Sequence, residues 1–318
     1  MKNLLLIALL LLVYTNAQSQ YKIKAYDFKQ LENKVLYIPK YEVDSDYAKK
    51  LTKKGKFDKL KTTKEKAAFY NEIWSEAMAN SAYDATPYEI RSFDSKKLFK
   101  EKNKKAIVLM FWQQYKTVNW YAGLWVTGPK KQLIAQTLIN GLDLDDEGDI
   151  RLMINLLNYS LTMSLELNEE EKKTKYSTFR SKYKEDVIAF EENIENLTFL
   201  VPKYVEGDIG KFEKRNAQIK EALKLWNICE YKWITLDEID EVRAEGDPNS
   251  FYWRALPIYS NVGGVSVVMY SLNYLLTCER DDVVFYWLGS KKMKPSQATK
   301  IQTEIREDAA RYRKKMKE

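Results

Sequence analysis

LENKVLYIPKY, residues 31–41, and IENLTFLVPKY, residues 194–204, are two versions of one segment. Glu, Asn, Pro, Lys and Tyr stand at matching positions in both. Equivalent positions of the two segments are 163 residues apart, far more than the few tens of residues of a solenoid repeat, so the spacing indicates a duplicated domain. The chain is therefore expected to build the same fold twice.

Each copy continues with the same order of predicted elements. A short strand ends at a proline, which cannot donate to a strand ladder, and an amphipathic helix, a pair of aromatic strands, a further strand and a last helix follow. These are residues 34–39, 65–81, 106–113, 119–127, 133–139 and 146–167 in the first copy, and 197–201, 216–229, 251–259, 264–272, 283–288 and 296–315 in the second. The order predicts an α+β fold of two tandem duplicated domains, each a mixed or antiparallel sheet of about four to five strands with two helices packed on it.

The first residues predict export. Residues 1–17 combine a positive start, an apolar stretch at 4–14 and small side chains before Gln18, which is the layout of a cleavable signal peptide. The apolar stretch is too short to span a bilayer, and no later stretch is long enough, so no transmembrane segment is predicted. We expect a periplasmic or extracellular product, with the first repeat at 21–167, a linking helix at 168–193 and the second repeat at 194–318.

Composition excludes several function classes. The 52 basic and 45 acidic residues give a mixed surface, which is far from the signature of a nucleic-acid-binding protein. The chain has no histidine, which removes Ser–His–Asp and Cys–His nucleophile systems and histidine-based zinc sites. Carboxylates are the main reactive groups that remain.

An acidic cluster has two interpretations. Its carboxylates, Asp143, Asp145, Glu147 and Asp149, follow the first half of an EF-hand loop and are candidate calcium ligands, although position twelve is Ile154 where a glutamate is required. The alternative is the acidic N-terminus of the following helix, with Asp145 as N-cap and the other acids favoured by the helix dipole. No other cofactor is predicted.

Carboxylates also allow an enzyme. A glycoside hydrolase needs two carboxyl groups about 5–10 Å apart, for which Asp143, Asp145 and Glu89 are the candidates. Glu89 aligns with Glu238 of the second copy, within the acidic run 237–241 that is predicted to be a solvated strand or turn.

A lysine-rich segment is present in the first copy and has no counterpart in the second. The alignment gives the first copy about fourteen extra residues, within a stretch at 49–66 that holds nine lysines. Its candidates for contact with an anionic surface, such as lipid head groups or an acidic glycan, are Lys49, Lys50, Lys53, Lys54 and Lys56. The alternative is a solvated loop without a partner.

Cysteines and aromatic residues leave further alternatives open. Cys229 and Cys278 are either one disulfide, which an oxidising compartment allows, or two buried thiols. The aromatic strands at 106–127 and 251–259 are either a platform for sugar rings or, as cross-strand pairs usually are, part of the core.

Three motifs carry a resemblance. They are YIPKY at 37–41, DATPYEI at 84–90 and NGLDL at 140–144, and with them the chain resembles uncharacterised exported proteins of Bacteroidota, a likeness that brings no known activity. The order of elements is also similar to that of small periplasmic α/β domains, of the type found at the N-terminus of TolB and in curli-secretion lipoproteins.

These observations predict a non-enzymatic binding or scaffolding protein of the cell envelope, with an envelope protein or glycan as partner. The alternative is a carboxylate-dependent hydrolase that acts on an envelope glycan.

Overall fold

A computed structural model gives the fold of most of the chain. The residues that it describes are 26–27, 31, 33–92, 106–114, 117–127, 132–166, 177–205, 212–262, 265–289 and 293–317. The predicted signal peptide at 1–17 lies outside them.

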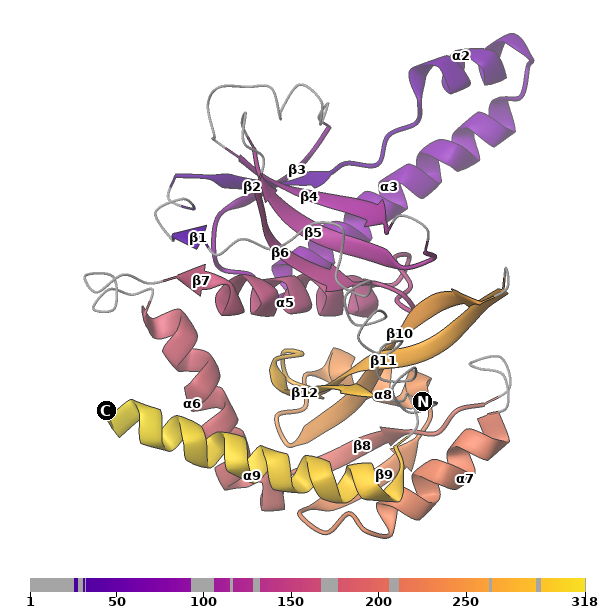
Figure 1. The fold of residues 1–318 in the computed structure, drawn as a ribbon. Coiled ribbons are helices and arrows are strands. Elements are labelled where there is room, and N and C mark those ends of the chain that lie inside the picture. The colour runs from indigo at the N-terminus through magenta and orange to yellow at the C-terminus, as the bar shows by residue number, and fades with distance from the viewer. Residues whose placement is uncertain are drawn as a thin grey trace.

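The first half is a five-stranded mixed sheet with helices on one face. Its elements are β2 (Val35–Pro39), α2 (Ser45–Lys53), α3 (Phe57–Ala79), β3 (Tyr88–Arg91), β4 (Ala106–Gln113), β5 (Trp120–Val126), β6 (Gln132–Leu138) and α5 (Glu147–Met163). The strand order is β3-β2-β4-β5-β6 (Figure 1). β2 is parallel to both of its neighbours, whereas β4, β5 and β6 form an antiparallel meander.

The second half repeats this topology. Its elements are β8 (Thr198–Pro202), α7 (Phe212–Leu223), β9 (Glu230–Ile234), α8 (Leu236–Glu245), β10 (Ser250–Val262), β11 (Val265–Thr277), β12 (Val283–Gly289) and α9 (Pro295–Lys317). The order β9-β8-β10-β11-β12, with β8 parallel to β9 and β10, matches the first sheet strand for strand. The predicted α+β class with two sheet-containing halves is confirmed.

Short elements connect the halves. β1 (Tyr26–Asp27) pairs in parallel with β7 (Leu165–Glu166), so the start of the described chain lies beside the end of α5. α6 (Ser177–Asn193) and a 3-10 turn at Ile194–Asn196 then lead into β8. α6 occupies part of the predicted linking helix at 168–193 and packs against α9, which it crosses in Figure 1.

The repeated Pro-Lys-Tyr sequence marks one junction in both halves. The Tyr41 N–H donates to Asn71 Oδ1 at 2.8 Å, and Asn71 Nδ2 donates back to the Tyr41 carbonyl at 3.0 Å. Tyr204 and Asn216 make the same two hydrogen bonds at 3.0 and 2.7 Å. An asparagine, Asn71 on α3 and Asn216 on α7, therefore fixes the chain as it leaves the first long strand of each half.

This junction corrects the sequence alignment. The residues of these pairs are 30 and 12 positions apart, so the first half carries 18 extra residues between the tyrosine and the asparagine, rather than about fourteen, and they include α2. Glu89 lies in β3, but Glu238 lies in α8, so the two are not equivalent. By strand register the counterpart of Glu89 is Lys232 in β9.

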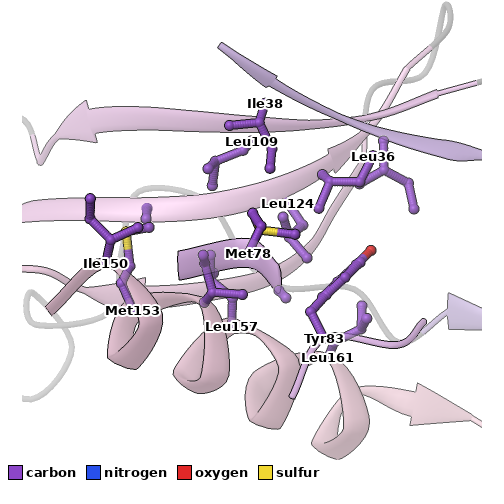
Figure 2. Packing of buried hydrophobic residues seen from close by; sticks show 14 of the residues in the cluster. Leu36, Ile38, Met78, Tyr83, Leu109, Leu124, Ile150, Met153, Leu157 and Leu161 are labelled. Carbon is purple, nitrogen blue, oxygen red and sulfur yellow. The ribbon is translucent and has the colours of Figure 1, made fainter. Parts of the chain in front are cut away.

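The first core lies between its sheet and two helices. Figure 2 shows Leu36, Ile38, Leu109 and Leu124 of the sheet facing Ile150, Met153, Leu157 and Leu161 of α5. Trp74 and Met78 of α3 complete the cluster, and both are almost fully buried. Burial of each such side chain contributes about 1.5–3 kcal/mol to the stability of the fold. The core therefore fixes the C-terminal part of α3 against the sheet.

A further core joins the two halves. Leu152 and Leu156, on another face of α5, pack against Leu200, Tyr252 and other side chains of the second sheet. α5 thus contacts both halves, because it also packs on the first sheet through residues such as Ile150.

Candidate binding surface

Asp149 of the acidic cluster joins the first half to the second. Asp149 is buried, and Arg254 of β10 donates to both of its carboxylate oxygens at 2.7 and 2.8 Å. The Asp143 N–H donates to the same carboxylate at 2.8 Å. Burial raises the pKa of Asp149, and the charge of Arg254 opposes this shift.

The helix cap within this cluster differs from the prediction by one residue. Asp146, not Asp145, is the N-cap of α5 and accepts the N–H of Asp149 at 2.9 Å. Asp145 instead accepts the Tyr70 hydroxyl at 3.3 Å, and Glu147 accepts Asn80 Nδ2 at 3.3 Å. The described residues include no group of three or more His, Cys, Asp or Glu placed to hold a metal ion. The four predicted calcium ligands therefore have separate protein partners.

Of the candidate catalytic carboxylates, Asp143 and Asp145 lie together, since the Asp145 N–H donates to Asp143 Oδ1 at 2.9 Å, but Glu89 is not brought near them. Leu36, Ile38 and Ile90 face the helix-covered core of the first sheet, so Glu89, which alternates with Ile90 along β3, lies on the opposite face. Glu89 pairs there with Arg91 at 3.4 Å. Asp145 lies on the helix side, where Tyr70 of α3 reaches it.

A buried ionic network crosses the interface near the acidic cluster. Asp281 is completely buried and accepts Arg243 Nε at 2.8 Å, Arg151 Nε at 3.0 Å and the Tyr252 hydroxyl at 2.6 Å. Arg243 also donates to the Gly148 carbonyl at 2.9 Å. Because solvent does not reach Asp281, the network has a structural role. No local sequence pattern predicts it.

The two cysteines are free thiols. Cys229 packs against the core of the second half and lies 3.3 Å from Trp226 Nε1, whereas Cys278 belongs to the cluster between the halves. Burial raises the pKa of both thiols. The alternative of a disulfide is therefore not what the structure contains.

Most of the predicted aromatic platform is core. Phe251, Tyr252 and Trp253 are fully buried, and Trp112 stacks on Tyr121 at 5.9 Å between ring centres.

The second acidic run is a helix rather than the predicted strand or turn. Thr235 caps α8 and forms a capping box with Glu238, in which each side chain binds the other residue's backbone. Asp240 pairs with Arg243 one turn later. These acids thus stabilise a helix start and extend the buried network.

The lysine-rich segment is a helical arm, not the predicted loop. We call residues 45–66 the lysine arm; it comprises α2 and the first part of α3, and Figure 1 shows it projecting away from the first sheet. Asp44 caps α2 by accepting the Tyr47 N–H, and Leu51 is its buried residue. Gly55 makes the turn with a φ of +64°, a conformation that glycine adopts without strain.

The positive charge of the lysine arm is largely unopposed. Nine lysines face three carboxylates there. All nine are exposed, and the ion pairs found along this described segment are Lys49–Asp46 at 3.5 Å and Lys61–Glu65 at 3.9 Å, both well exposed and therefore weak. Lys56 is the N-cap residue of α3, at the positive end of that helix, where the dipole disfavours a cation. Lys50, Lys53 and Lys54 lie at the C-terminal end of α2, where the dipole favours cations. Helix stability therefore does not explain the placement of Lys56.

Exposed aromatic rings accompany these lysines. Phe57, the first residue of α3, is 61% exposed, Phe69 is 54% exposed and Tyr47 is 38% exposed. The basic C-terminal part of α9 differs, because Arg313 pairs with Glu191 and Glu192 of α6. The lysine arm thus combines unpaired cations with exposed rings.

Comparison with known proteins adds no relative to this picture: no family model matches the chain, and neither the curated proteins nor the solved structures include a significant match. Within the described ranges, none of the helices combines the length and the apolar character that crossing a bilayer requires.

Proposed function

We propose that this protein is an exported, non-enzymatic binding or scaffolding protein of the cell envelope, and that the lysine arm is its binding element. The observation that carries the proposal is the difference between the copies. Asp149 of the acidic cluster is used to join the halves, whereas the 18 extra residues of the first copy contribute to an arm that projects from the fold.

The remaining features support binding rather than catalysis. The signal-like residues 1–17 support export, and Glu89, one of the carboxylates suggested for a hydrolase, lies on the opposite face of the first sheet from Asp145. Cations that no acid of the described chain neutralises are suited to hold an anionic partner, because partner charge replaces a solvated counterion atmosphere.

Reversal of charge on the arm should abolish envelope binding. The variant Lys50→Glu/Lys53→Glu/Lys56→Glu is expected to reduce, by at least about tenfold, the fraction of purified protein that sediments with envelope membranes at low salt, since three attractive charges become repulsive. The matched control is Lys214→Glu/Lys220→Glu/Lys294→Glu, which changes the net charge equally at exposed lysines of the second half. Equal loss in both variants would show that net charge alone matters and would contradict a role for the arm.

A further inference from the structure

We propose that the surface bound by the lysine arm is an anionic phospholipid bilayer, with the Phe57 ring entering the headgroup region and the surrounding lysines contacting lipid phosphates. This inference rests on the proposed function, because it names the partner class of the same arm.

The tip of the arm has the geometry for such contact. Phe57 follows directly on the turn between α2 and α3, and Lys54 and Lys56 precede it on that turn. Lys61 and Lys64 follow Phe57 at spacings of four and seven residues, which places all three on one face of α3. Because this tip projects from the first sheet (Figure 1), a flat surface can reach it without displacing the two packed halves.

The arm is preorganised for binding. α2 lies against α3 through its buried Leu51, and the turn is closed by the Lys56 N–H, which donates to the Leu51 carbonyl at 3.0 Å. The tip therefore needs little ordering when it meets a membrane, so less conformational entropy opposes the association.

Charge and ring chemistry together favour lipid over an acidic glycan. Each lysine held near an anionic membrane strengthens binding by about fivefold, so several lysines around one tip give a strong preference for negative lipids. Phenylalanine offers no hydrogen-bonding group to sugar hydroxyls, whereas its ring is favoured at the boundary between headgroups and acyl chains. Phe57 and Phe69, the two most exposed rings of this region, are of this kind.

Vesicle flotation tests the inference. The protein, expressed with its own N-terminal segment and purified after export, is mixed with vesicles of phosphatidylcholine alone or with about one third phosphatidylglycerol. We expect co-flotation with the mixed vesicles at least about tenfold above that with phosphatidylcholine, and weaker binding as salt screens the lysines. Phe57→Ala should lower binding by about fivefold or more at every salt concentration, because the ring contributes through apolar burial. Tyr231→Ala, which removes another exposed ring from β9 of the second half, serves as the matched control and should bind as the wild type does.

A second readout reports insertion directly. In a Phe57→Trp variant, brominated lipids should quench the added fluorescence above the level of the wild-type tryptophans. Equal binding to both vesicle types, or no effect of Phe57→Ala, would overturn the lipid inference. Arm-dependent sedimentation with envelope membranes, together with no vesicle binding, would overturn it and leave the proposed function standing. If the Lys50→Glu/Lys53→Glu/Lys56→Glu variant kept both envelope sedimentation and vesicle binding, the lipid inference and the proposed function would both be overturned.

Discussion

Replacement of Asp281 by alanine is expected to lower the free energy of unfolding by about 3–5 kcal/mol, the largest effect that we predict for a single charged residue. Asp281 accepts hydrogen bonds from Arg151, Arg243 and Tyr252 and is completely buried. Without its carboxylate, two buried guanidinium groups lose their shared counter-ion. Chemical denaturation followed by circular dichroism measures the change.

A matched control separates burial from charge. Glu221→Ala removes one partner of the exposed Lys224–Glu221 pair, whose atoms are 2.7 Å apart, and should cost less than about 0.5 kcal/mol. If Asp281→Ala fails to fold, Asp281→Asn keeps the size of the side chain and reports the loss of charge alone. A change below about 1 kcal/mol in both Asp281 variants would contradict a stabilising role for the network.

The same residue predicts a dependence on pH. Burial by itself would raise the pKa of Asp281, but Arg243 and then Arg151 outweigh it and hold this pKa below its usual value. A lowered folded-state pKa gives stability that is present above the unfolded-state pKa, about 3.9, and is lost as the pH falls through the folded-state value. Below about pH 4, the free energy of unfolding of the wild type should therefore fall more steeply than that of Asp281→Asn. Denaturation curves at a series of pH values provide the test, and parallel slopes would contradict it.

The second large effect is expected for Trp74→Ala, which should also lower the free energy of unfolding by about 3–5 kcal/mol. Trp74 is almost fully buried under the first sheet. Its ring packs edge to face with the Phe111 ring, with 6.0 Å between the ring centres. Its removal leaves a cavity at the place where α3 docks. Phe57→Ala provides the control on the same helix, since Phe57 is mostly exposed and its loss should change stability by less than about 0.5 kcal/mol. Similar melting temperatures for the two variants would contradict this assignment of the core face of α3.

The fold was predictable where local pattern and long-range contact agree. The repeated Pro-Lys-Tyr ends a strand in both halves, and the spacing of Trp74, Ala77 and Met78 predicts a buried helix face, as the structure confirms. The lysine-rich segment was misjudged as a loop because Leu51 is the one buried residue of α2, and because α3 begins at Phe57 without a side-chain cap. α2 is only nine residues long, polar on average and buries a single side chain, so the sequence of this segment resembles that of a solvated loop.

The acidic run in the second half did carry a signal. Thr235 followed by Glu238 three residues later is the pattern of a capping box, and it marks the start of α8. The interface gave no such pattern. Arg151 and Asp281 are 130 residues apart and Asp149 and Arg254 are 105 apart, so these pairings depend on how two complete sheets pack.

The placement of α5 between the two halves limits how many copies can stack. The buried positions of α9 follow those of α5 at a constant offset, with Ile301 in place of Met153 and Ile305 in place of Leu157. At this offset, Lys300 and Glu304 stand where α5 has Leu152 and Leu156, and they pair with each other at 3.3 Å. A further sheet that packed on α9 as the second sheet packs on α5 would meet the Lys300–Glu304 ion pair instead of two leucines. The second copy thus acts as a terminating cap: it limits to two copies an arrangement that could otherwise be repeated.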